Sequence, residues 1–473
     1  MCGVAGIHAP GRDAAALAAL AIFSLQHRGQ ESAGLAVSDG TGVMVYKDLG
    51  LVNQVLDERR LASLSGERAI AHCRYSTTGS TVWENSQPAF RLGPARSVAV
   101  GHNGNLVNTR ALLELLPGGR DRMIGTTDTE LLTALLATEP GDDLVAALLQ
   151  VLPRVSGAYS LVVMDEQRVV GVRDPHGFRP LVLGRLPDEG WVLASETCAL
   201  DALGAELVRD VAPGEMVVLG ERLPSGEPAA PRSVRFAEGR EQLCVFELIY
   251  FARPDSYMLG RNLYEVRRRM GEALAREAPA EADLVMPVPD TGAPAAAGFA
   301  EASGIPYREG MVRNRYSGRT FIQPSTNLRQ RGVTVKLSPL REQVRDRRLV
   351  VVDDSIVRGT TTRQIVELLR RAGAREVHLR ISAPPIFHPC FYGIDTQIET
   401  ELIAGQKSVD EIRDYLGADS LSYLSIGGVL DAIELPRERF CFACFDGRYP
   451  VPVPYDPGNH KFVLERDDAA VVG

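Results

Sequence analysis

Short apolar runs alternate with turn-forming residues throughout the first half of the chain. Asp-Gly and Asn-Gly pairs, which favour tight turns between antiparallel strands, recur between the runs. The clearest runs cover residues 42–46, 97–100, 159–164 and 215–219. Two longer apolar stretches, residues 14–25 and 129–136, have the length of helices. The pattern therefore predicts antiparallel sheets accompanied by helices.

The second half has a different pattern, in which the apolar runs are continuous. Residues 284–289 and 349–352 are such runs, and they are typical of strands covered on both faces in a parallel sheet. Residues 361–371 have a helical period, Gly373 supplies a helix stop, and residues 377–381 form the next apolar run. This order predicts a strand–helix–strand unit and an α/β fold for this half.

A Pro- and Gly-rich segment, residues 221–231, separates the two patterns. The chain has 473 residues, which is enough for two or three domains. We therefore expect one domain at residues 2–233 and a second at residues 241–473. Each is long enough to bury a hydrophobic core of its own.

Composition narrows the range of partners and compartments. Lysine and arginine number 52 against 60 acidic residues, and the net charge of −8 disfavours a general nucleic-acid binder. The longest early apolar run, residues 14–25, is shorter than the ~20 residues of a membrane-spanning helix. We therefore expect no membrane partner. Seven cysteines are too few for a disulfide scaffold, which predicts a cytoplasmic protein.

The N-terminal sequence places a cysteine directly after Met1. Removal of Met1 would give Cys2 a free α-amine, which titrates near ~7.7–8 and can act as general base for the thiol of the same residue. A cysteine at this position alone is also compatible with an ordinary terminal residue. The interpretation as a nucleophile gains weight from four segments rich in polar, turn-forming residues, at 26–34, 72–77, 101–105 and 125–130.

The segment 349–362 has the pattern of a phosphate-binding site. An apolar strand ends in two adjacent carboxylates, Asp353 and Asp354, and a Gly/Thr loop then opens a helix. Backbone N–H groups at a helix N-terminus bind phosphate, and the carboxylates suit ribose hydroxyls or Mg²⁺. The chain has neither the P-loop motif typical of ATPases nor the Gly-x-Gly-x-x-Gly motif typical of dinucleotide-binding proteins, which disfavours both classes.

Four further cysteines form a candidate metal site. Cys441 and Cys444 are a Cys-x-x-Cys pair, and Cys244 and Cys390 lie far from them in sequence. Four thiolates bind either Zn²⁺ or an iron–sulfur cluster, and the spacing does not choose between them. Cys73 and Cys198 have no assigned chemistry, and we expect both to be buried in packing.

The polar segments of the first half, in their order, resemble the glutaminase domain of class II (N-terminal nucleophile) amidotransferases. The resemblance implies that Cys2 attacks the side-chain amide of glutamine, and that the Asn103 side chain and the Gly104 N–H form the oxyanion hole. It further implies that three residues bind or support the glutamine: Arg28, Arg74 and Asp128.

The segment 349–362 looks like the phosphoribosylpyrophosphate (PRPP) signature of type I phosphoribosyltransferases. The resemblance implies Mg²⁺ on Thr291, Asp353 and Asp354, and contact with PRPP across the signature, the pyrophosphate loop and two cationic positions. The implied PRPP-binding residues are Asp353, Asp354, Ser355, Val357, Arg358, Gly359, Thr360, Thr361, Thr362, Asp290, Thr291, Gly292, Lys336 and Arg319.

Taken together, the motifs resemble one family over essentially the whole chain, the glutamine PRPP amidotransferases of the iron–sulfur-containing, Bacillus-type branch. This implies an α+β glutaminase domain of αββα architecture, followed by an α/β phosphoribosyltransferase domain. It also implies one 4Fe-4S cluster on Cys244, Cys390, Cys441 and Cys444. The implied reaction makes 5-phosphoribosylamine from PRPP and glutamine, the first step of de novo purine biosynthesis, with ammonia passed between two sites.

The family also implies a homo-oligomer, either a tetramer or a dimer, and feedback inhibition by purine nucleotides. Three alternative functions remain. One is a paralogue that aminates PRPP for a secondary pathway, and another is a different class II amidotransferase, such as a sugar-phosphate aminating enzyme. The third is a PRPP- or nucleotide-sensing regulator without catalysis.

Overall fold

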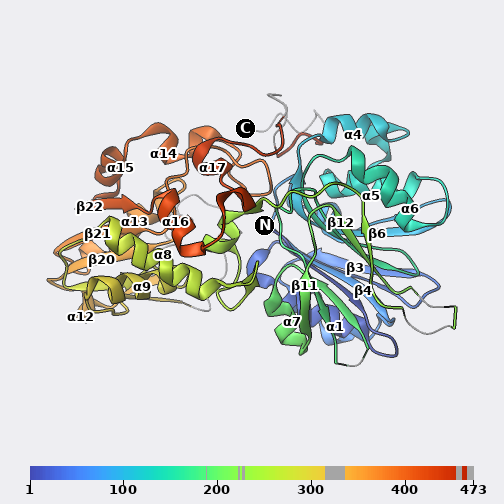
Figure 1. Cartoon of the computed structure of the whole chain (residues 1–473), viewed down its shortest axis with the longest axis horizontal. Coiled ribbons are helices and arrows are strands. Elements are labelled where there is room, and N and C mark those ends of the chain that lie inside the picture. The colour runs from blue at the N-terminus through green and yellow to red at the C-terminus, as the bar shows by residue number, and fades with distance from the viewer. Residues whose placement is uncertain (188, 222–223, 226–228, 315–335, 454–460, 466–473) are drawn as a thin grey trace.

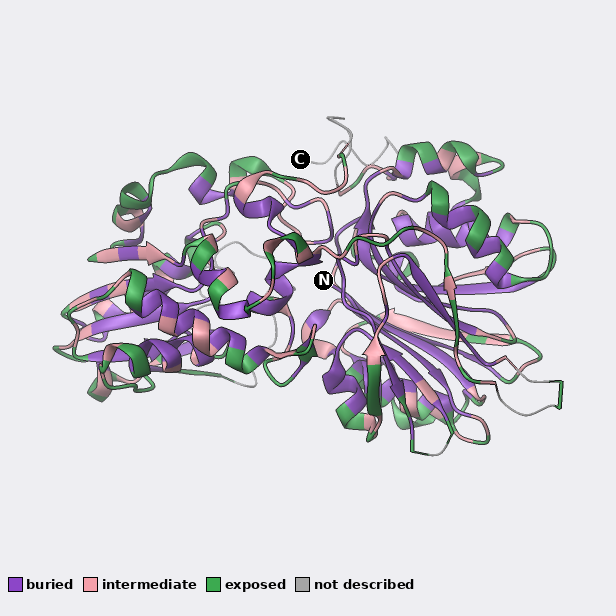
Figure 2. Ribbon diagram, in the orientation of Figure 1, coloured by how far each residue is buried: buried purple, intermediate pink, exposed green. Residues whose placement is uncertain are grey.

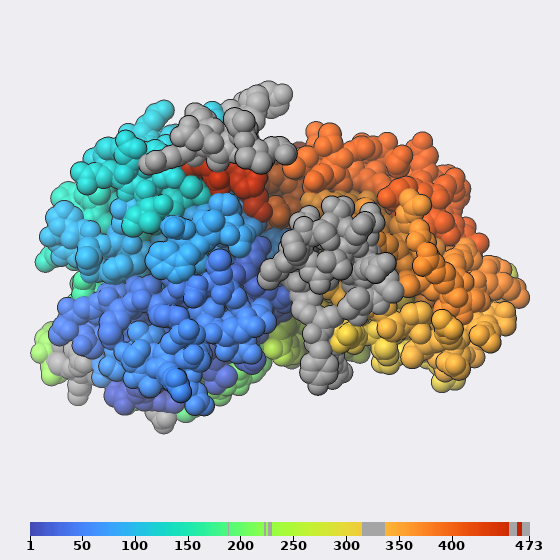
Figure 3. All heavy atoms as spheres, turned by 180° about the vertical axis from the view of Figure 1, so that it is seen from behind, coloured from blue at the N-terminus to red at the C-terminus, as the bar shows by residue number. Residues whose placement is uncertain are grey.

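The chain folds into two halves that lie side by side in the computed structural model (Figure 1). The structure describes all residues except 188, 222–223, 226–228, 315–335, 454–460 and 466–473. Viewed from behind, the first half runs from blue to green and the second from yellow to red (Figure 3). Among the described residues, no helix combines the length and the apolar character that crossing a membrane requires.

Two antiparallel sheets packed face to face form the centre of the first half. The seven-stranded sheet has the order β11-β9-β10-β1-β4-β2-β3 and the six-stranded sheet the order β13-β12-β8-β7-β6-β5. The strands of the first sheet are β1 (Gly3–His8), β2 (Ser32–Ser38), β3 (Val43–Leu49), β4 (Arg68–Arg74), β9 (Val182–Arg185), β10 (Trp191–Ala194) and β11 (Glu206–Asp210). Those of the second are β5 (Ala89–Leu92), β6 (Ser97–Leu106), β7 (Gly157–Met164), β8 (Val169–Arg173), β12 (Glu215–Leu219) and β13 (Arg232–Arg235).

A layer of helices covers the outer face of each sheet. Helices α1 (Ala14–Ser24) and α7 (Thr197–Leu203) pack on the first sheet, and α4 (Thr109–Leu115), α5 (Asp128–Thr138) and α6 (Leu144–Val151) pack on the second. Two short helices, α2 (Val52–Val55) and α3 (Glu58–Leu61), follow β3. Apolar side chains fill the space between the sheets, so the central strands are buried on both faces (Figure 2). The predicted αββα architecture is confirmed.

A parallel sheet of order β17-β20-β21-β22 is the core of the second half. Its strands are β17 (Leu284–Pro287), β20 (Arg348–Asp353), β21 (Glu376–Ile381) and β22 (Ser420–Tyr423). Helices α8 (Leu263–Glu277), α9 (Ala293–Ser303) and α16 (Ile426–Ile433) pack on one face, and α13 (Thr360–Arg371) and α15 (Val409–Leu416) on the other. This confirms the α/β fold that the continuous apolar runs predict.

The second half also contains several short elements. They are β14 (Leu243–Cys244) paired with β23 (Phe440–Cys441), β15 (Tyr257–Met258) with β16 (Arg261–Asn262), β18 (Met311–Arg313) with β19 (Leu337–Pro339), and the helices α12 (Arg341–Val344), α14 (Ile403–Gln406) and α17 (Ala443–Asp446). Strand β13 pairs with β12 and ends at Arg235, so the first half continues slightly beyond the expected boundary at residue 233.

The predicted elements agree with the observed ones to within a few residues. The helix expected at 14–25 is α1, which begins after Asp13, whose side chain accepts hydrogen bonds from the N–H groups of Ala15 and Ala16. Such a cap satisfies backbone donors that the helix itself leaves unpaired. Cys73 and Cys198 are buried against α1, as expected for packing residues.

Helices α8 and α9 approach so closely that each places a glycine against the backbone of the other. A Cβ atom on Gly271 would lie 1.8 Å from the carbonyl oxygen of Ala295, and one on Gly298 would lie 1.8 Å from that of Arg268. No side chain can be accommodated at either position without separating the helices. The contact fixes α8 against α9, and α9 follows the loop of the predicted pyrophosphate site.

We expect Gly271→Ala to lower the free energy of unfolding by about 1–3 kcal/mol, because the methyl group overpacks the contact with α9. Thermal unfolding followed by circular dichroism measures the effect. Gly427→Ala is the matched control, since Gly427 is exposed on α16 and only the Ser425 hydroxyl lies near, at 3.4 Å. Equal melting of the G271A and wild-type proteins would contradict the observed helix contact.

Candidate functional site

The first candidate site surrounds Cys2, which immediately precedes β1 and is 5% exposed. Its backbone nitrogen lies 3.2 Å from Oδ1 of Asn103, a residue of the facing sheet. Its sulfur lies 3.4 Å from both the backbone nitrogen and the carbonyl oxygen of Tyr75. The thiol is therefore held at the end of β4, where the two sheets meet.

Burial raises the pKa of the Cys2 thiol above its usual value. The nearby positive end of the chain, the Tyr75 N–H and the Arg74 guanidinium oppose this effect only in part. A thiol in this state is a weak nucleophile near neutral pH, because the thiolate is the reactive form. Attack by Cys2 therefore requires a base beside it.

Asn103 and Gly104 lie next to Cys2 within strand β6, and not in a hairpin turn. The Nδ2 atom of Asn103 is buried and has no hydrogen-bond partner among the described residues. A buried donor without an acceptor is costly, so this amide suits a ligand oxygen. Gly104 has φ +156°, and a Cβ there would lie 1.9 Å from the carbonyl oxygen of Ala158. The close approach of β7 thus requires glycine.

Two charged residues flank this group. Arg74 ends β4, and its guanidinium donates to the carbonyl oxygens of Thr78 and Gly79, at 3.0 and 3.3 Å. Asp128 begins α5, and its carboxylate accepts from the N–H of Leu106 at 3.0 Å. Burial would raise the pKa of Asp128, but His102 and backbone N–H groups outweigh burial and lower it. The site thus offers one fixed cation and one fixed anion.

Arg28 lies behind Cys2 and is buried. Its Nε donates to the carbonyl oxygen of Cys2 at 2.8 Å, and its Nη2 donates to Glu247 at 2.9 Å. Its Nη1 contacts Glu196 and also donates to Glu247 at 3.1 Å. Burial opposes the charge, but the two glutamates raise the pKa of Arg28. The guanidinium is thus engaged by the protein's own groups.

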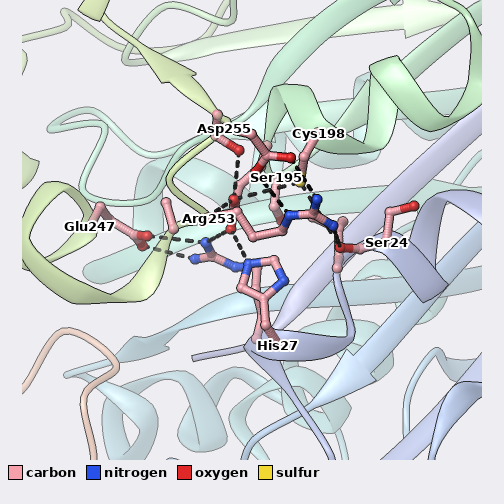
Figure 4. Close-up of polar contacts among 12 residues, drawn as sticks. Ser24, His27, Ser195, Cys198, Glu247, Arg253 and Asp255 are labelled. Carbon is pink, nitrogen blue, oxygen red and sulfur yellow. Dashed lines mark hydrogen bonds and ion pairs between the residues drawn. The ribbon is translucent and has the colours of Figure 1, made fainter. Parts of the chain in front are cut away.

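A buried network of charged residues extends from Arg28 across the junction of the halves (Figure 4). Glu196 accepts from His27 at 2.8 Å and from the backbone N–H of Arg253 at 2.9 Å. Glu247 accepts a further bond from Arg179 at 3.3 Å. Burial would raise the pKa of Glu196, but His27 and Arg28 hold it well below its usual range. The network therefore joins residues from both halves.

The sequence interpretation missed Glu196, Glu247 and Arg179. Only Glu247 carries a visible signal, since it is the single charged residue in the apolar segment 243–251, three residues after the predicted ligand Cys244. A lone carboxylate in an apolar run is expected to have a buried partner. The other two residues resemble ordinary surface charges until the fold brings them together.

The second candidate site lies at the carboxyl ends of β17 and β20. Asp353 ends β20, and Asp354 accepts hydrogen bonds from the hydroxyls of Ser355, at 2.7 Å, and of Thr291. Burial raises the pKa of both carboxyls, and the neighbouring carboxylate of Asp354 raises the pKa of Asp353 further. A cation would relieve this unfavourable burial.

A Cβ on Gly292 would lie 2.5 Å from the carbonyl oxygen of Val352, so glycine lets the loop approach β20.

Residues 355–362 form the loop after β20 and the first turn of α13. Gly359 precedes α13 with φ +75°, which favours glycine. Thr360 and Thr361 are exposed at the helix N-terminus, whereas Thr362 is buried. The start of α13 therefore presents backbone N–H groups and hydroxyls to solvent, which suits a phosphate group.

The predicted PRPP site also includes charged residues within and outside this loop. Arg358 binds Glu401, and Asp290 pairs with Arg313 at 3.0 Å. Lys336 is half-buried beside β19, and its carbonyl oxygen accepts from the Asn314 N–H at 2.8 Å. Arg319 lies outside the described residues.

The four cysteines of the predicted cluster gather at the junction of the two halves. Cys244 and Cys441 are register partners in the parallel pair of β14 and β23. The carbonyl oxygen of Cys444 accepts from the N–H groups of Phe387 and His388, both at 3.0 Å, and the chain reaches Cys390 two residues later. All four are free thiols, and each is 7–8% exposed.

The electrostatic surroundings of these thiols suit a positively charged group. Burial raises the pKa of Cys244 to about 11, and Cys390 adds to the effect while Arg179 opposes it. Burial and the neighbouring thiols raise the pKa of Cys441 and Cys444 well above the usual range. Within the described part of the chain, no three or more His, Cys, Asp or Glu side chains surround a position for a single metal ion. A four-iron cluster takes one thiolate per iron, so its ligands need not converge on one ion.

Residues after Cys390 contact the first half directly. The Asn105 side chain donates to the carbonyl oxygen of Phe391 at 3.0 Å, and a Cβ on Gly393 would lie 3.0 Å from the carbonyl carbon of Gly104. Near the end of the chain, Arg120 donates to the carbonyl oxygen of Leu464 at 2.8 Å, where red C-terminal residues lie beside the cyan surface (Figure 3). The second half therefore covers the strand that carries Asn103.

Two family models match the chain. One, described as a glutamine amidotransferase domain, matches residues 72–202, and the other, a phosphoribosyl transferase domain, matches residues 259–385. Among curated proteins, the amidophosphoribosyltransferase of Mycobacterium tuberculosis is 51% identical over 98% of this chain and 89% of its own length. The amidophosphoribosyltransferase of Synechococcus elongatus is 50% identical over 98% of this chain and 94% of its own length.

Two solved structures share the fold over almost the whole chain. The first, described as the allosteric regulatory enzyme of purine biosynthesis, is 45% identical with a TM-score of 0.88 and covers 96% of this chain and 97% of its own. The second is a glutamine PRPP amidotransferase from B. subtilis complexed with ADP and GMP. It is 44% identical with a TM-score of 0.87, covering 96% of this chain and 98% of its own.

We expect Glu196→Gln to lower the free energy of unfolding by about 3 kcal/mol or more at neutral pH, because Arg28 loses a buried anionic partner. The pKa of Glu196 is lowered in the fold, so its contribution is fully present above the ordinary glutamate pKa of ~4.3 and is lost as the pH falls below it. The stability difference between wild type and E196Q should therefore shrink below about pH 4.3. Urea unfolding from pH 3.5 to 7 measures it, and a difference that grows on acidification would contradict the assignment.

Proposed function

The chain belongs to the amidophosphoribosyltransferase family, and from this premise we propose that it uses two separate sites to transfer the amide nitrogen of glutamine to PRPP. The products are 5-phosphoribosylamine, glutamate and pyrophosphate, and the reaction is the first step of de novo purine biosynthesis. The match to a phosphoribosyl transferase domain supports PRPP as the acceptor in place of a sugar phosphate.

At the first site, Cys2 is the nucleophile. Removal of Met1 frees the α-amine of Cys2, which takes the thiol proton and so overcomes the raised pKa of the buried thiol. The thiolate attacks the side-chain carbonyl carbon of glutamine. As the tetrahedral intermediate collapses, the α-ammonium returns a proton to the leaving nitrogen, and ammonia departs. Water then cleaves the thioester and releases glutamate.

The observation that carries this assignment is the unpartnered amide of Asn103. Its Nδ2 is buried, while its Oδ1 lies 3.2 Å from the Cys2 nitrogen, so one side chain faces both the base and the reacting carbon. In the tetrahedral intermediate the oxyanion would accept from this Nδ2 and from the Gly104 N–H. Such fixed donors stabilise developing charge without reorganising.

The charged residues of the same site orient the substrate. Arg74 binds the α-carboxylate of glutamine, because a planar guanidinium fits a carboxylate with two parallel bonds. Asp128 accepts from the α-ammonium group. The two side chains interact electrostatically across the site, which supports a substrate carrying both charges on one carbon. Arg28 supports the nucleophile from behind through the Cys2 carbonyl.

At the second site, Asp353, Asp354 and Thr291 would hold Mg²⁺, which supplies charge neutralisation for pyrophosphate as it leaves. The raised carboxyl pKa values support a cation there. Mg²⁺ usually binds through one or two carboxylates together with substrate oxygens, which suits this small donor set. The backbone at the start of α13 would hold the 5-phosphate, and ammonia would then displace pyrophosphate at C1.

Three further properties belong to the proposal. The four buried thiols would hold one 4Fe-4S cluster. Bound there, the cluster would link three segments of the chain. Purine nucleotides would act as feedback inhibitors, as supported by a structural relative complexed with ADP and GMP. The enzyme would act as a homotetramer or dimer in the cytoplasm, where reducing conditions preserve both the thiol and the cluster.

Cys2→Ala should abolish glutamine-dependent amination of PRPP, with a loss on the order of 10³-fold or more, because no thioester can form. Amination from added ammonium salts should remain, since the second site is intact. Asp354→Asn should have the opposite pattern, losing both amination reactions on the order of 100-fold while retaining glutamine hydrolysis measured without PRPP. Both reactions are followed by product assay with purified protein.

The two variants control for each other, because each preserves one reaction while removing the other. Retention of glutamine-dependent activity by C2A would disprove the assigned nucleophile. Unchanged amination by D354N would place PRPP binding elsewhere.

Anaerobically purified protein should be brown and contain about four iron and four acid-labile sulfide per chain. Cys441→Ser should lose the visible absorption and the iron, since one ligand of the cluster is removed. Cys198→Ser is the control, because Cys198 is buried beside α1 away from the four thiols. Stoichiometric zinc without iron would overturn the cluster assignment.

A further inference from the structure

Glu247 is a fully buried carboxylate supplied by the second half of the chain. It opens the short π-helix η5 (Glu247–Phe251), which follows β14 and Cys244 in an otherwise apolar segment. Its Oε1 accepts from Arg28 at 2.9 Å and from Arg179 at 3.3 Å, and its Oε2 accepts from Arg28 at 3.1 Å. The carboxylate therefore binds two arginines of the first half at once.

The contact with Arg28 leads directly to the nucleophile. The same guanidinium donates through Nε to the Cys2 carbonyl at 2.8 Å, while the Cys2 nitrogen lies 3.2 Å from Asn103. The two ends of the Cys2 backbone are thus held by different residues, Asn103 at the nitrogen and Arg28 at the carbonyl. A displacement of the Arg28 guanidinium would rotate this backbone unit and move both the amine and the thiol.

We propose that Glu247 is a positioning residue of the glutaminase reaction, which makes the geometry of Cys2 depend on the docked second half. The proposal rests on the proposed function of Cys2 as a nucleophile. Arg28 lies between two glutamates, so Glu196 of the first half defines one side of the guanidinium and Glu247 defines the other. Without Glu247, the guanidinium is drawn toward Glu196 alone, and its bond to the Cys2 carbonyl is weakened.

The charge of Glu247 is essential to this role. In the part of the chain that the structure describes, the hydrogen bonds to its carboxylate come from guanidinium N–H groups of Arg28 and Arg179. A glutamine at this position keeps the shape but presents an NH₂ group to one of these donors, which removes an acceptor from a buried cation. Aspartate keeps the charge on a shorter side chain. Comparing the two variants therefore distinguishes the effect of the negative charge from the effect of side-chain length.

The test compares Glu247→Gln with the control Glu241→Gln in the full-length holoenzyme. Glu241 also pairs with an arginine, Arg439, and none of the hydrogen bonds and ion pairs between described residues joins it to Arg28 or Cys2. E247Q should lower the kcat of glutamine hydrolysis on the order of 10- to 100-fold, as expected for a slightly misplaced nucleophile. Its KM for glutamine should change less than threefold by our estimate, because Arg74 and Asp128 are untouched. E241Q should match wild type in both.

Two readouts distinguish positioning from loss of folding. Ammonia-dependent amination by E247Q should stay within twofold of wild type by our estimate, because the second site does not use Cys2, and E247D should restore part of the lost kcat. Equal loss of both activities, or a kcat within twofold of wild type, would overturn the proposal. The rate of Cys2 alkylation by iodoacetamide, read by peptide mass spectrometry, should change at least threefold in E247Q and stay unchanged in E241Q.

A double-mutant cycle tests whether Glu247 acts through Arg28. Arg28→Lys should itself lower the glutaminase kcat, and adding E247Q to R28K should cost less than threefold more, since the link is already broken. Additive losses would overturn the proposed route. Failure of the proposed function gives a different result, because wild type itself would then lack glutamine hydrolysis. The alkylation rates would still decide whether Glu247 positions Cys2.

Discussion

Four buried charges at the junction of the two halves constrain the rest of the structure. Arg28 and Arg179 come from the first half, and Glu247 comes from the second, while Glu196 of the first half also binds the backbone of Arg253 in the second. An unpaired charge in such a position costs several kcal/mol, so the halves are held in the one arrangement that pairs all four. The proposed nucleophile, Cys2, lies at the edge of this group, because the Nε–H of Arg28 donates to the Cys2 carbonyl. The docking of the halves and the geometry of the proposed glutaminase site therefore depend on the same contacts.

Much of the fold follows from local patterns. The continuous apolar runs at β17 and β20 predict a parallel sheet. Strands that are covered on both faces are apolar at successive positions and do not alternate between polar and apolar residues. The Gly/Thr segment before α13 predicts a helix N-terminus suited to phosphate, and Gly359 indeed has a positive φ there. The order of the strands within each sheet is harder to predict from the sequence. Strand β1 pairs with β4 and β10, which are far along the chain, and no local pattern specifies such partners.

The candidate sites likewise contain some residues that the sequence identifies and others that it does not. Asp353 and Asp354 are adjacent in sequence, so their joint role is visible without a structure. Cys2 and Asn103 lie 101 positions apart, and only the resemblance to a family connects them before the sheets are seen face to face. Glu196 and Arg179 have no signal at all, because a chain with 24% charged residues contains many similar side chains. What identifies them is complete burial with opposite partners, which is a property of the tertiary structure alone.

The element that joins the two sites is the short helix η5. At its start, Glu247 binds Arg28 and Arg179 of the first half. Arg267 of α8 spans the helix, because it donates to the carbonyl oxygens of Leu248 near its start, at 2.8 Å, and of Ala252 just after its end, at 2.6 Å. The buried Arg267 also interacts electrostatically with Asp354, so its guanidinium belongs both to this turn and to the surroundings of the proposed PRPP site. This turn of backbone is thus held by Arg28, which also contacts Cys2, and by Arg267, which also interacts with Asp354. In the proposed reaction, ammonia made at the first site must meet PRPP at the second, and this shared turn fixes the position of the two proposed sites relative to each other.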